Sequence, residues 1–189
     1  MNQNLYLIRH TTPDIAKGIC YGFTDINVAE SFESESVMVQ EKLQSVNFSH
    51  FYSSPLSRCS QLAHKLYKGN IAYDDRLKEL NFGTMEMKAY DQMDKQWLDE
   101  WMGDFVNICC PEGESFLQLQ NRVVDFYQEI LKKEQPVIGI ATHGGVIRSL
   151  ICHILEIPLT NAFKVVFDWG GITKINIKNN LVKVDYINR

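Results

Sequence analysis

Short apolar runs alternate along this chain with longer stretches in which apolar residues recur at helical spacing. The short runs end in polar or turn-forming residues and predict buried strands at 5–9, 50–53, 71–73, 137–141, 163–167, 173–177 and 181–186. Helical spacing predicts helices at 34–46, 56–67, 115–133 and 145–155, and a shorter helix near 90–102. Strands that alternate with helices favour a three-layer α/β/α sandwich with a mostly parallel central sheet, to which the final hairpin adds an antiparallel edge.

Capping and turn residues mark several element boundaries. Ser54 is expected as the N-cap of the second helix, with Pro55 at its first position. Ser115 and Gln118 form a capping-box pattern at the start of the long helix. The pair Asn179-Asn180 predicts the turn of the final hairpin.

The chain fits one domain of ordinary size. It has 189 residues, and no Pro-, Gly- or Ser-rich linker divides them. We therefore predict a single domain over 1–189, with an inserted segment at about 80–113 that is rich in aromatic and methionine side chains. That segment either covers a flat ligand as an apolar lid or packs as an accessory subdomain.

Composition narrows the partners and the compartment. The formal net charge of −4 gives no overall attraction to nucleic acid or to an anionic membrane. No run approaches the roughly 20 apolar residues of a membrane span, and the apolar run before Arg9 is too short for a signal peptide. The five cysteines include no CxxC pair and fit reduced thiols. We expect a cytoplasmic protein without a nucleic acid or membrane partner.

Two predicted strands end at a histidine. Arg9-His10 closes the first strand, and His143, followed by Gly144-Gly145, closes the strand at 137–141. The carboxyl ends of neighbouring strands in an open α/β sheet line the ligand crevice, so both imidazoles are expected at one site. A guanidinium can hold two phosphate oxygens while an imidazole attacks phosphorus, and glycine amides can face an anion. This combination favours phosphate chemistry on a small molecule.

Two further side chains fit the same chemistry. Arg58 falls one turn inside a helix that opens after a strand, where free amides and the helix dipole attract an anion. Glu79 lies between apolar residues just after a strand, so its carboxyl suits proton transfer to a leaving group. Taken singly, the sequence favours a surface arginine and an exposed loop glutamate, and only the joint occurrence at strand ends favours the site. Arg122 and Arg148, on helices, are expected to be solvated or ion-paired.

Metal binding is the competing chemistry for these residues. His10, His143 and Glu79 are ligand types that suit zinc or iron. Two arginines aimed at the same point would repel a cation, however, and no acidic cluster offsets them. We therefore predict a site with no metal ion and no cofactor.

The strand-end motifs form a recognisable set. They are Leu7-Ile8-Arg9-His10, Tyr52-Ser53-Ser54-Pro55-Leu56-Ser57-Arg58, Leu77-Lys78-Glu79-Leu80-Asn81-Phe82-Gly83, Pro111-Glu112-Gly113-Glu114-Ser115 and Thr142-His143-Gly144-Gly145-Val146-Ile147-Arg148. Over nearly the whole chain, this set resembles the histidine phosphatase superfamily, the phosphoglycerate mutase-like enzymes. The resemblance implies a phosphoglycerate mutase-like fold and hydrolysis of a phosphomonoester through a phosphohistidine.

The same resemblance implies a role for each candidate residue. Five are expected to be catalytic: His10 as nucleophile, Glu79 as proton donor and acceptor, and Arg9, Arg58 and His143 as groups that neutralise phosphoryl charge. Three are expected to contact substrate: Tyr21, Gly22 and Gly144.

The segment after His10 points to one branch of the superfamily. Thr11-Thr12-Pro13-Asp14 and the following residues 18–25 look like the alpha-ribazole phosphatase branch, which implies alpha-ribazole 5′-phosphate and cobalamin assembly. The alternatives are a broad-specificity or sugar-phosphate phosphatase, a phosphoglycerate mutase-like enzyme, and a non-catalytic phosphate-binding module. Met85 and Met87 replace the tryptophan and second glycine that members usually carry after the acid glutamate.

Overall fold

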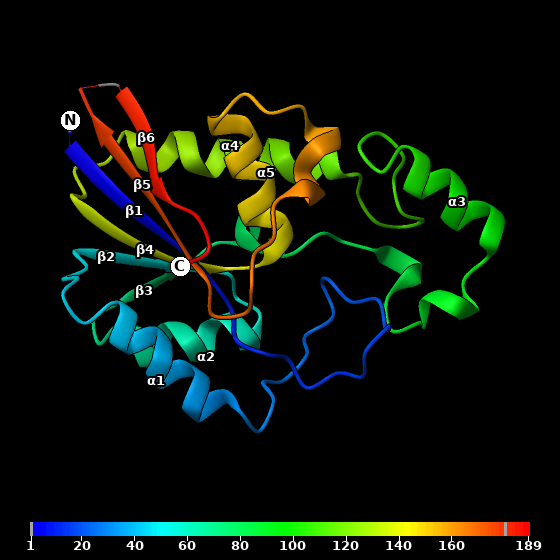
Figure 1. Cartoon of the computed structure of the whole chain (residues 1–189), viewed down its shortest axis with the longest axis horizontal. Helices are drawn as coiled ribbons and strands as arrows, with labels where there is room; N and C mark the ends of the chain where they lie inside the picture. Colours follow the sequence, from blue (N-terminus) through cyan, green and yellow to red (C-terminus); the bar gives the residue numbers. More distant parts are fainter. Residues whose placement is uncertain (1, 180) are drawn as a thin grey trace.

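The computed structural model describes residues 2–179 and 181–189, and Figure 1 shows how their elements are arranged. The strands are β1 (Asn2–Arg9), β2 (His50–Ser53), β3 (Ile71–Tyr73), β4 (Val137–Thr142), β5 (Ile172–Lys178) and β6 (Leu181–Tyr186). The α-helices are α1 (Phe32–Lys42), α2 (Ser57–Leu66), α3 (Lys95–Gly103), α4 (Phe116–Leu131) and α5 (Gly144–Ile154). Short 3₁₀ helices lie at Asp75–Leu77, Gly83–Met85, Tyr90–Gln92 and Leu159–Lys164.

The strands form one mixed sheet in the order β3-β2-β4-β1-β5-β6. The pairs β3–β2, β2–β4 and β4–β1 are parallel, whereas β5 runs antiparallel to both β1 and β6. The predicted fold class, a mostly parallel sheet with an antiparallel edge between helical layers, is confirmed. The turn predicted at Asn179-Asn180 reaches Asn180, which lies outside the described residues.

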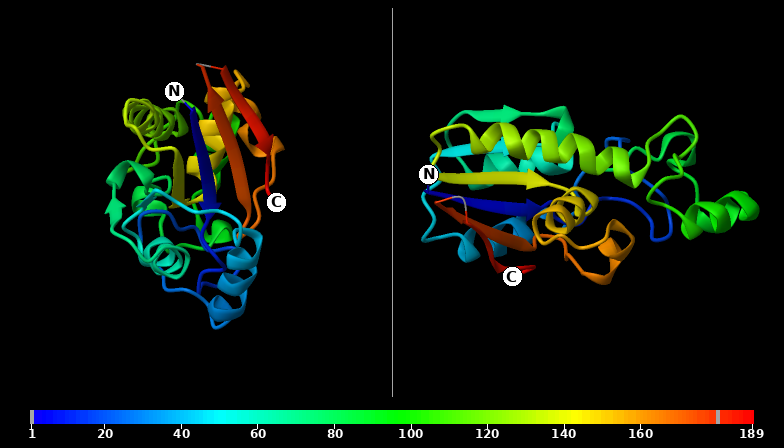
Figure 2. Two further views of the ribbon diagram at one scale, coloured as in Figure 1. Left: turned by 90° about the vertical axis from the view of Figure 1, so that its left-hand side faces the viewer. Right: turned by 90° about the horizontal axis from the view of Figure 1, so that it is seen from above.

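Alternating side chains of β1 bury on opposite faces of the sheet. Leu5 and Leu7 join the larger core cluster with α4 and α5, while Tyr6 and Ile8 join the smaller cluster with α1 and α2. This period of two is what a strand covered on both faces requires. Figure 2 shows the two helical layers on either side of the sheet.

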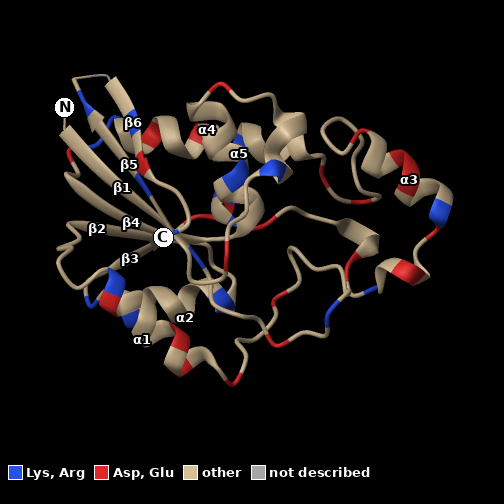
Figure 3. Ribbon diagram, viewed as in Figure 1, with Lys and Arg blue, Asp and Glu red and all other residues tan. Residues whose placement is uncertain are grey.

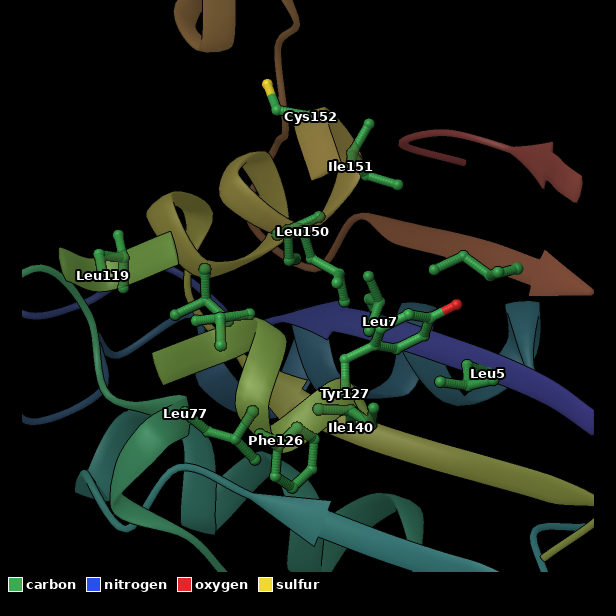
Figure 4. Packing of buried hydrophobic residues seen from close by; sticks show 14 of the residues in the cluster. Leu5, Leu7, Leu77, Leu119, Phe126, Tyr127, Ile140, Leu150, Ile151 and Cys152 are labelled. Carbon is green, nitrogen blue, oxygen red and sulfur yellow. The ribbon is translucent and has the colours of Figure 1, made fainter. Parts of the chain in front are cut away.

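The larger core cluster anchors α4 and α5 above the strands. Figure 4 shows Phe126 and Tyr127 of α4 and Leu150 of α5 gathered around Leu7 and Ile140 of the sheet. Each fully buried side chain of this kind stabilises the fold by about 1.5–3 kcal/mol relative to its exposed state. The first residues of both helices therefore lie near the carboxyl ends of the parallel strands.

The prediction of a strand at 163–167 is wrong. A 3₁₀ helix occupies Leu159–Lys164 instead, and the chain after it is irregular up to β5. Phe163 and Val166 are 54% and 65% exposed, and Phe167 is buried, which is not the alternation of a strand. The position beside β1 is taken by β5, so this segment does not pair with β1.

The observed starts of two helices differ from the predicted ones by a few residues. Leu56, not Ser54, is the N-cap of α2, so Pro55 precedes the helix. The Ser115–Gln118 capping box is confirmed at the start of α4. The helix predicted near 90–102 begins later, at Lys95, because the Asp94 carboxylate accepts a hydrogen bond from the Trp97 amide and caps it there.

The segment around α3 extends beyond the sheet edge at which β1 and β4 end (Figures 1 and 2). Its short helices are joined by irregular chain from about residue 80 to residue 113. The division into one domain and an inserted lid stays a prediction. None of the helices in the described ranges is long and apolar enough to cross a lipid bilayer.

Candidate active site

The ends of three parallel strands bring the predicted residues together. The amide of His10, just after β1, donates to the carbonyl of Thr142 in β4 at 2.9 Å. The amide of Ser54, just after β2, donates to the carbonyl of Ala141 at 3.0 Å. The sheet register therefore places His10 beside His143, and their ring centroids are 5.2 Å apart.

His10 is held as a neutral imidazole with one nitrogen free. Its side chain is buried, and Nδ1 lies 2.7 Å from the carbonyl oxygen of Thr11. A carbonyl oxygen only accepts, so Nδ1 carries the proton and Nε2 keeps its lone pair. Burial, followed by the nearby guanidinium groups of Arg58 and Arg9, lowers the pKa of His10 well below its usual value. The ring is therefore in the nucleophilic form at neutral pH.

His143 has a different environment. Its Nε2 lies 2.8 Å from the hydroxyl oxygen of Ser54 and 3.4 Å from the Cys59 sulfur. Burial and the charge of Arg58 lower the pKa of His143. Burial also raises the pKa of the Cys59 thiol, which therefore stays protonated. Because the Ser54 hydroxyl can either donate to or accept from Nε2, it does not fix which nitrogen of His143 carries the proton. A bound anion can therefore favour a protonated nitrogen on His143.

The two predicted arginines are fixed by backbone carbonyls. Arg58 is fully buried and donates to the carbonyls of Gly22 at 2.6 Å and Thr24 at 3.0 Å. Arg9 donates to the carbonyl of Phe167. These bonds orient the guanidinium groups and leave the Nε–H of each arginine without a partner.

Unpartnered buried polar atoms concentrate at this site. Among the described residues, six buried side-chain nitrogen or oxygen atoms have no hydrogen-bond partner. Four of the six belong to the site: Nε of Arg9, Arg58 and Arg148, and Oγ1 of Thr11. A buried unsatisfied donor costs about 1–3 kcal/mol, which a bound anion would recover. All four atoms can donate, so they suit an oxyanion.

Glu79 reaches the site from the loop after β3. It is half-buried, and its two carboxylate oxygens accept from the amides of Leu80 at 2.9 Å and Gly145 at 3.1 Å. A Cβ at position 145 would lie 2.3 Å from Glu79 Oε1. The glycine therefore permits the close approach between the carboxylate and the start of α5.

A charged pair from outside the site braces the Glu79 loop. Arg122 of α4 donates to the carbonyls of Arg76, Lys78 and Glu79, each at 2.7 Å. The same guanidinium pairs with Glu114, with its two bonds at 2.6 and 3.0 Å. Of the two states predicted for Arg122, solvated or ion-paired, the structure shows the ion pair, and its contacts fix the backbone that carries Glu79.

A small cavity lies next to Glu79 and adjoins a larger one. The smaller, about 170 Å³, is lined by Ile19, Tyr21, Glu79, Leu80, Phe82, Tyr90, Phe116, Gly145, Arg148 and Phe163. The larger, about 550 Å³, is lined by Phe82, Tyr90, Leu98, Trp101, Met102, Phe105 and Phe163. Three aromatic residues, Phe82, Tyr90 and Phe163, border both cavities. The smaller cavity, which holds the charged groups of Glu79 and Arg148, thus adjoins a wholly uncharged one formed largely by the segment around α3.

The expected substrate contacts fall in different places. Tyr21 lines the smaller cavity, and its ring centroid is 5.4 Å from the guanidinium carbon of Arg58. Gly22 is buried and contributes its carbonyl to Arg58. Gly144 is the first residue of α5, beside Arg9. Their contact with substrate stays a prediction.

The two methionines that depart from the superfamily pattern do not border either cavity. Met85 ends a 3₁₀ helix, and Met87 is 52% exposed. Met87 has a φ of 63°, the left-handed region that favours glycine, so the backbone keeps the conformation suited to the residue it replaces. The intervening Glu86 accepts from the amides of Phe23 and Thr24 and holds the loop that binds Arg58.

One arginine beside the site was not among the predicted site residues. Arg148 of α5 was expected to be solvated or ion-paired, yet it is half-buried, lines the smaller cavity and pairs with no acidic side chain in the described part of the chain. Figure 3 shows the basic residues on β1 and α5 close to where the strands end. Its position four residues after Gly144, in the first turns of the helix, is the signal that could have found it.

A protein metal site requires several ligand side chains that converge on one point. Within residues 2–179 and 181–189, no group of three His, Cys, Asp or Glu side chains is arranged to hold a metal ion. The absence of a metal ion and of a cofactor stays a prediction.

Comparison with known sequences identifies the class of protein. The profile of the histidine phosphatase superfamily (branch 1) matches residues 5–189. The match spans nearly the whole chain, so the protein belongs to this superfamily, and the resemblance found in the motifs is confirmed.

Individual relatives are distant. A protein of Hydrogenobacter thermophilus provisionally assigned as phosphoserine phosphatase 2 is 27% identical over 195 residues, which cover 99% of this chain and 96% of the relative. The alpha-ribazole phosphatase of Shigella flexneri superposes with a TM-score of 0.91 at 22% identity, covering 99% of this chain and 96% of its own. A mycobacterial glucosyl-3-phosphoglycerate phosphatase superposes with a TM-score of 0.87 at 22% identity, covering 100% and 99%. These superpositions show a shared fold.

Proposed function

We propose that the protein hydrolyses phosphomonoesters through a covalent phosphohistidine on His10. The observation that carries this proposal is the placement of a neutral imidazole, whose Nε2 is free, beside the unpartnered donors of Arg9, Thr11 and Arg58. A nucleophile next to empty oxyanion donors is the arrangement that phosphoryl transfer requires.

In the first step, the Nε2 lone pair of His10 forms a bond to phosphorus while the ester P–O bond breaks. The guanidinium groups of Arg9 and Arg58 neutralise charge on the phosphoryl oxygens, and His143 acts with them as a donor. Protonated Glu79 gives its proton to the departing alkoxide, which leaves as the alcohol.

In the second step, water attacks the phosphohistidine. Glu79, now a carboxylate, takes a proton from the water as its oxygen bonds to phosphorus. The P–N bond breaks and its electron pair returns to Nε2, so that inorganic phosphate and neutral His10 are released. No step draws on a metal ion.

For the substrate, we propose alpha-ribazole 5′-phosphate. The support is the apolar cavity that continues from the Glu79 pocket, because aromatic walls suit the flat dimethylbenzimidazole ring of that leaving group. The alpha-ribazole phosphatase of Shigella flexneri, which shares the fold, is consistent with this choice. The segment around α3 would then serve as the wall for the ring.

The first test replaces the nucleophile. His10→Ala should lower the hydrolysis of p-nitrophenyl phosphate by on the order of 10⁴-fold or more and should remove the phosphohistidine trapped by acid-free rapid quench. The assays contain EDTA, so that a bound metal ion does not contribute. His50→Ala, which changes an exposed histidine at the start of β2, is the matched control and should retain wild-type activity. Wild-type turnover in His10→Ala would refute the nucleophile assignment.

A substrate panel then separates the candidate reactions. The values of kcat/KM for alpha-ribazole 5′-phosphate, 3-phosphoglycerate and sugar phosphates are compared under the same conditions. A clear preference for the ribazole ester supports the proposal, whereas a higher value for a sugar phosphate or isomerisation of the phosphoglycerate overturns it.

A further inference from the structure

Arg148 lines the cavity at Glu79 and forms no ion pair with any described residue. No hydrogen bond or ion pair joins its guanidinium to another side chain in the described ranges, and its Nε is buried without a partner. Burial lowers the pKa of Arg148, yet guanidinium groups remain charged throughout the ordinary pH range. A half-buried charge of this kind is stabilised when a ligand supplies an acceptor.

The side chain is directed at the site by its place on α5. Long side chains on a helix turn back toward its N-terminus, and Arg148 follows Gly144 by one turn. A Cβ built on Gly144 would lie 2.9 Å from Nη1 of Arg148 and 3.3 Å from Nε of Arg9. The two guanidinium groups therefore flank the same point at the start of the helix.

Aromatic packing holds the guanidinium there. Its central carbon is 5.2 Å from the ring centroid of Phe163 and 5.5 Å from that of Phe167. Such contacts restrict the side chain while leaving its N–H donors free. Arg148 is therefore oriented before any ligand arrives.

The division of the cavity lining indicates what Arg148 contacts. Arg58 and His10 do not border the cavity, whereas Glu79 does. Because Glu79 protonates the departing oxygen in the proposed reaction, the cavity receives the leaving group. Of the described residues that line it, Arg148 carries the one positive charge.

We infer that Arg148 binds an oxygen acceptor on the leaving group, close to the ester oxygen, and so determines specificity. This inference rests on the proposed function and names the substrate class: phosphomonoesters of alcohols that carry a hydroxyl, ring oxygen or carboxylate near the ester carbon. Ribosides and hydroxy acids both supply that chemistry. Simple alkyl phosphates do not.

The test compares three small esters that differ in one group. Propyl phosphate has no second oxygen, 2-hydroxypropyl phosphate adds a hydroxyl, and 2-carboxyethyl phosphate adds a carboxylate. The wild-type protein should prefer at least one oxygen-bearing ester to propyl phosphate by kcat/KM. In Arg148→Met, that preference should fall by about 10- to 100-fold, the effect of losing a hydrogen bond to a charged group.

The two oxygen-bearing esters separate the sources of the acceptor. A larger loss on the carboxylate ester assigns Arg148 to hydroxy-acid phosphates, and a larger loss on the hydroxyl ester assigns it to sugar-like phosphates. Arg189→Met, which changes an exposed arginine at the C-terminus, is the matched control and should keep the wild-type preference. If Arg148→Met is unfolded by circular dichroism, Arg148→Lys replaces it and should lose part of the preference, because lysine lacks the planar fork.

The outcomes distinguish this inference from the proposed function. An unchanged ratio between the esters, whether all rates fall alike or none falls, overturns the role of Arg148 while leaving His10 chemistry intact. A wild-type protein that hydrolyses none of the three esters and forms no phosphohistidine contradicts the proposed function itself.

Discussion

His10 and His143 end neighbouring strands, yet their ring nitrogens have different partners. The Thr11 carbonyl fixes the proton of His10 on Nδ1, whereas the Ser54 hydroxyl lets His143 donate or accept. A bound phosphoryl dianion favours a protonated imidazole nearby, and His143 can take that proton without disturbing His10. The unequal roles proposed for the two histidines follow from this difference.

The contact between Gly145 and Glu79 gives a prediction at one residue. Gly145→Ala places a Cβ where the Glu79 carboxylate lies and breaks the hydrogen bond from the 145 amide. We expect kcat for alkyl phosphates to fall by on the order of 10²-fold, the scale of a misplaced general acid, while the protein stays folded. Steady-state kinetics and a thermal melt measure both effects.

Gly103→Ala is the matched control, because nothing in the structure lies within 4 Å of the added Cβ and its backbone is helical. Its kinetics should equal those of the wild-type protein. If Gly145→Ala retains full activity on alkyl phosphates, Glu79 is not the proton donor in the geometry described.

Which residues form the site was largely predictable, since the strand ends carry Arg9, His10 and His143 in sequence. Arg148 was not, because an arginine inside a helix has the same local pattern whether it faces solvent or a cavity. The cavity that Arg148 faces is formed by the loop that carries Glu79 and by Phe163. These parts of the chain are separate in sequence, and hydrophobic periodicity does not show that they lie together.

At the scale of elements, α4 stabilises the loop after β3. Arg122 donates to three carbonyl oxygens within residues 76–79 of that loop and is itself held by Glu114. A loop fixed by main-chain contacts keeps its side chains in place better than one that relies on surface packing. Arg122 is therefore a positioning residue for Glu79 and does not touch the reacting atoms.

Replacing Arg122 tests that role. Arg122→Met should lower kcat by about 10- to 100-fold for alkyl phosphates, whose alkoxide needs a proton, and by less for p-nitrophenyl phosphate, whose phenolate leaves without one. The ratio of the two rates measures the effect, and Arg122→Lys should restore part of it. A purely structural role predicts equal losses on both substrates, and that result would contradict the positioning of Glu79.

Elements with a strong hydrophobic pattern were predictable from sequence. Elements whose limits depend on a neighbouring strand or on a capping side chain were not. The strands β2, β3 and β6 have the predicted bounds because apolar runs between turn residues leave few alternatives. Residues 163–167 carry the same signal but lie partly in a 3₁₀ helix and partly in irregular chain, and β5 takes the position beside β1. The limits of α3 depend on the Asp94 cap, which hydrophobic spacing does not reveal.

In the whole molecule, the site lies at the carboxyl ends of the parallel strands, where helices of both layers begin. The larger core cluster fixes α4 and α5, and the smaller one fixes α2, which carries Arg58. Catalytic geometry and global stability are therefore linked through buried histidines that fold in the neutral form. That link makes stability depend on pH.

Both His10 and His143 have a lowered pKa in the folded protein, chiefly because of burial. Below an unfolded-state pKa of about 6.5, the unfolded chain binds protons that the folded state does not, so the free energy of unfolding falls as pH decreases. Each histidine contributes up to about 1.4 kcal/mol per pH unit. Urea unfolding between about pH 7.5 and about pH 5 should show this loss.

Between about pH 7.5 and about pH 5, the main carboxylates contribute little to the pH dependence of the free energy of unfolding. Hydrogen bonds from Lys133 and Arg76 lower the pKa of the exposed Glu129 to about 2. The stability that these bonds contribute is lost only as pH falls below the unfolded-state carboxyl pKa of about 4.3. The variant His10→Asn should reduce the slope above pH 5, because one of the two histidines no longer titrates. A wild-type stability that stays constant across the range would refute the neutral, buried state of the pair.

The unpartnered donors of Arg9, Thr11 and Arg58 also affect how the reaction ends. They can donate hydrogen bonds to the oxygens of a phosphoryl group, and those oxygens remain after the alcohol has left. Inorganic phosphate, as the released product, satisfies the same donors as the ester and competes for them. Product inhibition is therefore built into the site, and turnover should slow as the surrounding phosphate concentration rises.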